Sequence, residues 1–91
     1  MDDVADSPEL HVSVRFFAAA QAAAGVDESL VTLPAGATVA CVVSELSCRS
    51  DELAQILRRC SYLCDGVAVR DLEMKLHSGQ TVDVLPPFAG G

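Results

Sequence analysis

The sequence has few aromatic residues and few basic ones. It has no tryptophan, one tyrosine and three phenylalanines in 91 residues, although 51% of the chain is apolar. We therefore expect one small domain whose core is mostly Val, Leu and Ala. Six basic residues stand against thirteen acidic ones, which gives a net charge of −7. Because nucleic-acid binding needs a basic face, we expect no nucleic-acid partner.

Signals for membranes, secretion and metals are also missing. No apolar run approaches the roughly 18–20 residues that span a bilayer, so we expect no membrane segment. The first residues are acidic, unlike a signal peptide, which favours a cytoplasmic location. The four cysteines show no Cys-x-x-Cys spacing and lie far in sequence from both histidines. We predict reduced thiols and no metal site, with Cys41 and Cys60 as small core residues on helices.

The expected domain organisation is an acidic disordered arm (1–9), one domain (10–85) and an extended tail (86–91). Within the domain, alternation of apolar residues predicts strands at 11–17, 28–33, 67–70 and 81–85, with Phe16 as a core anchor. Residues 62–66 lead into the third of these strands. Leu72, Met74 and Leu76 predict either a short further strand or an irregular crossover, followed by a turn at 77–80.

Three helices are expected between these strands. The Ala-rich run 18–24 has high helix propensity and is followed by Gly25, which suits a helix end. Helical spacing predicts a second helix capped by Thr38 and a third capped by Asp51. Each of these two helices has a stripe of apolar residues that must be buried against an apolar surface. A sheet provides such a surface, which indicates an α+β domain. The stripes are Val39, Val42, Val43 and Leu46, and then Leu53, Ile56, Leu57 and Cys60.

Most arrangements of residues that support catalysis are absent. There is no Gly-rich phosphate loop and no recognisable Ser/His/Asp set. Asp51 and Glu52 are adjacent, so on a helix they point to different faces and do not form an acid–base pair. Arg58 and Arg59 lie late in a helix, where positive charge suits the helix dipole; we favour this interpretation over an anion site. The chain does not look like a complete enzyme.

The last six residues differ from the rest. The strand at 81–85 runs into Pro86 and Pro87, which cannot donate to a sheet ladder and direct the chain outward. Residues 86–91 can reach about 20 Å when extended. Phe88 has no obvious place in the core, which predicts a contact with a partner.

The sequence finishes with Ala89, Gly90 and Gly91. Gly90 and Gly91 lack a Cβ and fit a narrow channel, so the chain ends in a thin thread that carries a carboxylate. A carboxylate is a poor electrophile and must be activated, for example as an acyl adenylate. The activated carbonyl can then accept sulfur or be attacked by an amine.

Three segments resemble the MoaD/ThiS family of ubiquitin-like sulfur carriers, and the resemblance covers about residues 11–91. They are Val14-Arg15-Phe16-Phe17-Ala18, Val67-Ala68-Val69 and Leu85-Pro86-Pro87-Phe88-Ala89-Gly90-Gly91. The Pro-Pro-x-x-Gly-Gly ending is most similar to MoaD, the small subunit of molybdopterin synthase. The resemblance implies a β-grasp fold, a mixed sheet with helices packed on one face.

The resemblance also implies a function and partners. An E1-like (MoeB-like) adenylyltransferase would consume ATP to adenylate Gly91, and a cysteine desulfurase or rhodanese would supply sulfur for a thiocarboxylate. The tail would thread Ala89 and Gly90 into a MoaE-like large subunit, within a heterotetramer, and donate sulfur to the dithiolene of molybdopterin. Catalytic side chains would belong to the large subunit, and this chain would bind no cofactor. The positions matching partner contacts are Leu85, Pro86, Pro87 and Phe88.

Other functions stay open at this point. The chain could carry sulfur for thiazole, cysteine or tRNA thiolation, although the proline pair favours molybdopterin. It could be a ubiquitin-like modifier of lysines on other proteins; its single lysine, Lys75, argues against long self-linked chains. It could also be a β-grasp binding module in which the Gly-Gly ending is incidental. Formation of a thiocarboxylate at Gly91 separates the carriers from the other two classes.

Overall fold

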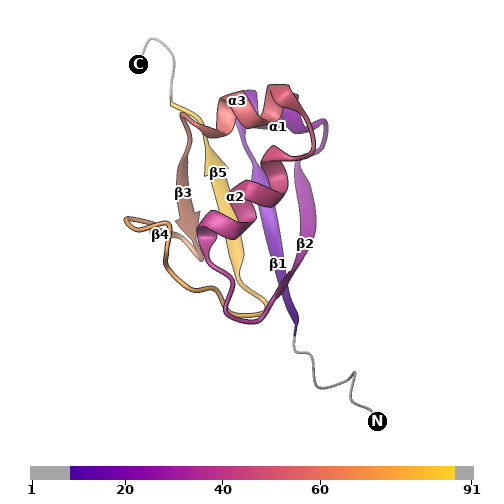
Figure 1. Ribbon diagram of the computed structural model, residues 1–91. Helices are drawn as coiled ribbons and strands as arrows, with labels where there is room; N and C mark the ends of the chain where they lie inside the picture. Colours follow the sequence, from indigo (N-terminus) through magenta and orange to yellow (C-terminus); the bar gives the residue numbers. More distant parts are fainter. Residues whose placement is uncertain (1–8, 88–91) are drawn as a thin grey trace.

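The computed structural model describes residues 9–87, which form a five-stranded sheet with three helices on one face (Figure 1). Residues 1–8 of the predicted acidic arm lie outside the described residues, and Glu9 already belongs to the first strand. The strands are β1 (Glu9–Phe16), β2 (Glu28–Pro34), β3 (Ser61–Cys64), β4 (Val67–Ala68) and β5 (Thr81–Leu85); the helices are α1 (Ala18–Ala24), α2 (Val39–Ser47) and α3 (Asp51–Leu57).

The strand order in the sheet is β2-β1-β5-β3-β4. β1 is antiparallel to β2 and parallel to β5, while β3 is antiparallel to both β5 and β4. The first and last strands therefore lie side by side in the middle of the sheet. The helix α2 lies across one face of this sheet (Figure 1). This mixed sheet with its helices on one face is the β-grasp arrangement, which confirms the expected fold.

The core lies between the sheet and the helices. Alternate residues of β1 point into it, as the period of a strand requires, and Phe16 is 2% exposed. Val, Leu and Ala supply all the buried apolar residues except Phe16, Tyr62 and Cys64, so the expectation drawn from the scarcity of aromatics is confirmed. Among residues 9–87, no helix is long and apolar enough to cross a membrane.

The helices follow their sequence signals closely. α1 covers the predicted range, and Gly25 ends it with a φ of 81°, a left-handed conformation that glycine adopts without strain. Thr38 caps α2 as predicted, because its Oγ1 accepts a hydrogen bond from the N–H of Cys41. The cap of α3 was predicted wrongly: Ser50, not Asp51, accepts from the N–H of Leu53, at 3.0 Å. Asp51 is the first helical residue, where its charge suits the helix dipole.

The third and fourth strands also differ from the prediction. β3 lies in a segment that was interpreted as a lead-in, and β4 has two residues rather than four. Asp65 and Gly66 both have positive φ, so they form a tight hairpin turn that pairs the two strands. The chain from β4 to β5 is irregular apart from a single bridge between Thr38 and Lys75, which confirms the crossover alternative.

The placement predicted for the cysteines was wrong. Cys41 is on α2 but exposed, and Cys60 is half-buried in the connection that follows α3. The cysteine in the core is Cys64, on β3. The helical spacing continued past the physical end of α3 because periodicity alone does not show where a helix stops.

Candidate functional site

β5 is the element from which the tail leaves the domain. It lies in the middle of the sheet, with β1 on one side and β3 on the other, and Val82 and Val84 are fully buried. Hydrogen-bond ladders to β1 and to β3 hold β5 on both sides, so the strand is a rigid base for the segment that follows it. Of the predicted contact residues, Leu85 lies opposite Ser61 at the end of this strand and is half-buried.

The two prolines differ in their surroundings. Pro86 continues the inward-facing alternation of Val82 and Val84, and it is buried against its own domain. Pro87 is exposed. Pro86 therefore fixes the point where the chain leaves the sheet, and a contact between either proline and a partner stays a prediction. The other predicted site residues lie outside the described residues: Phe88, Ala89, Gly90 and Gly91.

An ion pair that the sequence did not reveal lies beside the tail's base. Arg15 on β1 donates to Asp83 on β5 through two parallel hydrogen bonds, Nε to Oδ1 at 2.7 Å and Nη2 to Oδ2 at 3.0 Å. The Asp83 side chain is 9% exposed, whereas half of the Arg15 side chain is open to solvent. The hydrogen bond to Asp83, and then its charge, raises the pKa of Arg15 above its already high ordinary value. The pair thus fastens the two central strands together.

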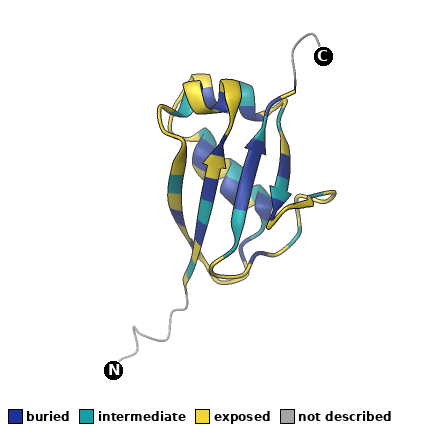
Figure 2. Ribbon diagram, turned by 180° about the vertical axis from the view of Figure 1, so that it is seen from behind, coloured by how far each residue is buried: buried dark blue, intermediate teal, exposed yellow. Residues whose placement is uncertain are grey.

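Figure 2 shows the face of the sheet turned away from the helices, which we call the open face. Around the ion pair, this face carries several apolar side chains. The guanidinium of Arg15 lies 5.5 Å from the centre of the Phe17 ring. Leu30, on β2, is 63% exposed. The strand pairing puts Leu63 and Leu85 on the same face. Apolar side chains around a satisfied charge pair form a surface suited to docking another protein.

A comparison with protein-family models adds the decisive observation. The model of the ThiS family matches residues 14–91, from β1 to the final glycine. The chain belongs to the ThiS family. The match includes the base of the tail and the Gly90-Gly91 pair, so the resemblance inferred from the sequence is confirmed at the level of the family.

Solved structures agree with this assignment. The Haloferax volcanii HVO 2177 protein is 30% identical, with a TM-score of 0.83, over 100% of this chain and 94% of that one. A protein named molybdopterin converting factor, subunit 1, from Pyrococcus furiosus is 28% identical, with a TM-score of 0.79, over 87% of this chain and 99% of that one. A search of curated proteins found no match.

More distant structures share the fold of this ThiS-family chain. Small archaeal modifier protein 1 from Haloferax volcanii is 21% identical, with a TM-score of 0.79, over 89% of this chain and 99% of that one. A complex of subunits 1 and 2 of the molybdopterin-converting factor from Helicobacter pylori contains a chain that is 21% identical, with a TM-score of 0.67, over 90% of this chain and 100% of that one.

The cysteines form no metal site in the part of the chain that the structure describes: no three Cys, His, Asp or Glu side chains gather there. Their environments differ. A hydrogen bond from the Thr38 hydroxyl lowers the pKa of the exposed Cys41 thiol, whereas burial raises the pKa of Cys60 and of Cys64. Cys41 is therefore more easily ionised than Cys60 and Cys64, and it lies on α2.

Proposed function

We propose that this chain is the sulfur-carrier small subunit of molybdopterin synthase, with the carboxylate of Gly91 as its working group. The proposal rests chiefly on one observation: the ThiS-family match runs through the Gly90-Gly91 pair, on a domain whose central strand leads directly into the tail. The Pro86-Pro87 pair and the similarity to a Pyrococcus furiosus protein named molybdopterin converting factor, subunit 1, favour the molybdopterin pathway.

The chemistry requires activation by another protein. An E1-like enzyme attaches AMP from ATP to the Gly91 carboxylate and releases pyrophosphate. A sulfur donor, such as a cysteine desulfurase or a rhodanese, then attacks through its persulfide and displaces AMP, which leaves an acyl disulfide between Gly91 and the donor. A second thiol reduces this disulfide by forming a new disulfide with the donor cysteine, which releases Gly91 as a thiocarboxylate. The large subunit receives the tail and uses this sulfur to build the dithiolene, after which the carboxylate can be charged again.

The domain's contribution is to hold and present the tail. β5 cannot move without breaking two ladders, and the buried Pro86 fixes the exit point, so little freedom has to be lost at the base of the tail on docking. We expect Leu85, Phe17 and Leu63 on the open face to contact the large subunit next to the channel that the tail enters. A β-grasp chain occurs in the Helicobacter pylori complex of subunits 1 and 2, which supports a large-subunit partner.

Intact-mass measurement tests the carrier function. The protein is incubated with ATP, an E1-like adenylating enzyme and a sulfur donor, and we expect one oxygen at Gly91 to be replaced by sulfur. A matched variant that lacks only Gly91 should fold equally well and acquire no sulfur. If no activating enzyme produces either an adenylate or a thiocarboxylate on the full chain, the chain is not a sulfur carrier.

A second assay separates the pathways. The thiocarboxylated protein is mixed with a MoaE-like large subunit and cyclic pyranopterin monophosphate, and we expect molybdopterin to form. Formation of the thiocarboxylate without any molybdopterin would instead indicate thiazole, cysteine or tRNA thiolation.

Modification of other proteins is the second candidate function. The shared fold with small archaeal modifier protein 1 favours it, and the same activated carboxylate would then be attacked by a lysine amine. Expression of the tagged chain in its native cells, followed by a search for tryptic peptides in which residues 76–91 are joined to a lysine, distinguishes this outcome, because Lys75 is the last tryptic site in the chain. Conjugates that disappear on deletion of Gly91 would support the modifier function.

A further inference from the structure

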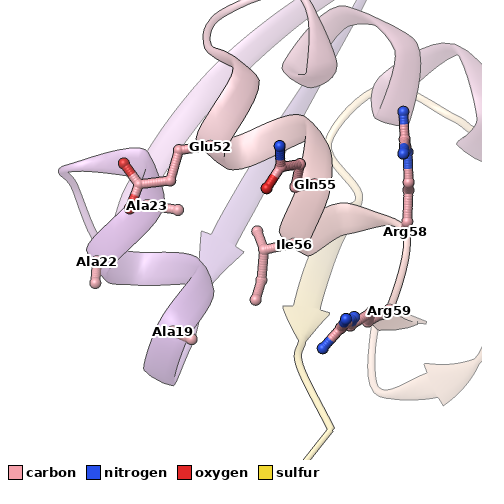
Figure 3. A pocket seen from close by; sticks show the side chains of 8 residues that line it. All are labelled: Ala19, Ala22, Ala23, Glu52, Gln55, Ile56, Arg58 and Arg59. Atoms are coloured by element: carbon pink, nitrogen blue, oxygen red, sulfur yellow. The ribbon is translucent and has the colours of Figure 1, made fainter.

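A groove of about 600 Å³ lies between α1 and α3 (Figure 3). Ala19, Ala22 and Ala23 of α1 form one wall, and Ile56 of α3 forms the other. Arg58 and Arg59 lie at one end, and Figure 3 shows Glu52 on the opposite side, near Ala23. We call the groove with its two arginines the α1–α3 corner. It combines an apolar floor with a cationic end.

The α1–α3 corner lies beside the base of the tail. Ser61 on β3 is paired with Leu85 on β5, and the two strands are antiparallel. Arg59 is two residues before Ser61 and Pro87 is two residues after Leu85, so both lie at the same end of the sheet. Figure 3 likewise shows Arg59 next to the chain that leaves β5.

The backbone of the corner is firmly held. Arg58 has helical φ and ψ angles of −63° and −21°, and the N–H of Arg59 donates to the carbonyl of Ile56 at 3.0 Å. The buried hydroxyl of Tyr62 donates to the carbonyl of Leu57 at 2.9 Å, which joins the end of α3 to β3. Both arginine side chains are exposed, and within residues 9–87 neither makes a salt bridge. The two side chains thus extend into solvent from a well-held stretch of backbone.

The charge of the corner contrasts with the rest of the protein. The chain carries −7 overall, and Arg58 and Arg59 are the only two basic residues adjacent in its sequence. An acidic partner surface would be repelled by most of this molecule and attracted at this corner. Such a pattern orients two proteins during their encounter, and here it would orient the tail toward the partner.

We propose that the α1–α3 corner binds an acidic segment of the E1-like adenylating enzyme, at the mouth of the channel that receives the tail. This inference rests on the proposed function, because an enzyme that encloses Gly91 has to contact the surface around Pro87. Arginine forms paired hydrogen bonds with carboxylates, and the alanine floor accepts an aliphatic side chain beside them. The partner is identified by these features: carboxylates next to an apolar side chain.

Steady-state kinetics of pyrophosphate exchange by the adenylating enzyme test the proposal. The double variant Arg58→Glu/Arg59→Glu should raise the KM for the carrier at least about tenfold at low salt, with kcat nearly unchanged. The increase should shrink between about 50 mM and about 300 mM salt, because added ions screen exposed charges. Arg58→Lys/Arg59→Lys should restore most of the binding, since it keeps the charge.

The matched control is Arg70→Glu/Lys75→Glu, which changes the net charge equally on the exposed segment between β4 and β5. It should change KM by less than about twofold. Equal KM values for the two Glu double variants would overturn the proposal, whether both are raised or neither is. If the Glu variant does not fold, Arg58→Gln/Arg59→Gln takes its place, with an expected KM increase of about threefold.

Two other possible occupants of the groove, a second copy of the chain and the chain's own tail, can be detected by separate experiments. If the wild type is a dimer by light scattering and the Glu variant is a monomer, a second copy covers the groove and the proposal is wrong. If deletion of residues 88–91 exposes Arg59 to chemical modification in the isolated protein, the groove holds the chain's own tail, which also overturns it. Failure of the wild type to be adenylated at all would refute the proposed function rather than the assignment of this corner.

Discussion

The single tyrosine offers a direct test of how firmly α3 is joined to the sheet. Tyr62 is 8% exposed, and its hydroxyl donates to the carbonyl of Leu57 at 2.9 Å. Burial raises the pKa of Tyr62 to about 12, with a smaller effect from the Cys60 thiol, against an ordinary value of about 10. Since the folded pKa is the higher one, this stabilisation is complete below about pH 10 and is lost as the pH rises through about 12.

The size of the effect follows from the shift. Two pKa units correspond to about 3 kcal/mol, and screening by solvent at the partly accessible ring reduces our expectation to about 2 kcal/mol. The variant Tyr62→Phe loses a hydrogen bond, but the Leu57 carbonyl still accepts from the N–H of Cys60 at 3.2 Å. We therefore expect a loss of about 1 kcal/mol at neutral pH, or a Tm lower by about 4–8 °C.

Ultraviolet absorbance of tyrosinate is the assay, because one tyrosine supplies the whole signal. The native protein should titrate near pH 12 and the urea-unfolded protein near pH 10. Circular dichroism at each pH shows whether the chain is still folded. The free energy of unfolding of Tyr62→Phe should change less between pH 10 and 12 than that of the wild type. A native midpoint near pH 10 in a folded protein would refute the burial of the Tyr62 hydroxyl.

Three further predictions address the cap, the thiols and the tail. Ser50→Ala should lower the free energy of unfolding in urea by about 1 kcal/mol and Asp51→Ala by about half as much; the reverse order would contradict the observed cap. Iodoacetamide should label Cys41 first and Cys64 last, as followed by peptide mass spectrometry, because burial raises the pKa of the latter. Phe88→Asp should weaken binding to the large subunit at least about tenfold by calorimetry without lowering the yield of adenylate; unchanged binding would remove Phe88 from the interface.

The sequence predicted most reliably the elements with strong local signals. The alanine run and Gly25 define α1 because propensity and a left-handed cap agree, and the alternation at 81–85 defines β5. β3 was missed because a four-residue strand gives little periodicity, and its hairpin partner has only two residues.

Features that depend on distant pairing could not be predicted in this way. Arg15 and Asp83 are 68 residues apart, and their contact follows only once β1 and β5 are known to be parallel neighbours. The α1–α3 corner likewise depends on the packing of two helices whose sequences are separated by β2 and α2. The tail could be recognised from the sequence because its motif is a run of consecutive residues. Such a motif can be identified without knowledge of the tertiary structure.

The central place of β5 has a consequence for how the protein is made. The β1–β2 pair and the β3–β4 pair share no ladder; β5, which follows the other four described strands in the sequence, pairs with both β1 and β3. Contacts between residues so far apart in sequence form late in folding. A chain interrupted before residue 81 therefore lacks the strand that closes the sheet, together with the tail. A truncated chain that lacks β5 also lacks the reactive end, because both belong to the same stretch of chain. A folded domain without the tail, which would compete for the partner proteins, is therefore not produced by incomplete translation.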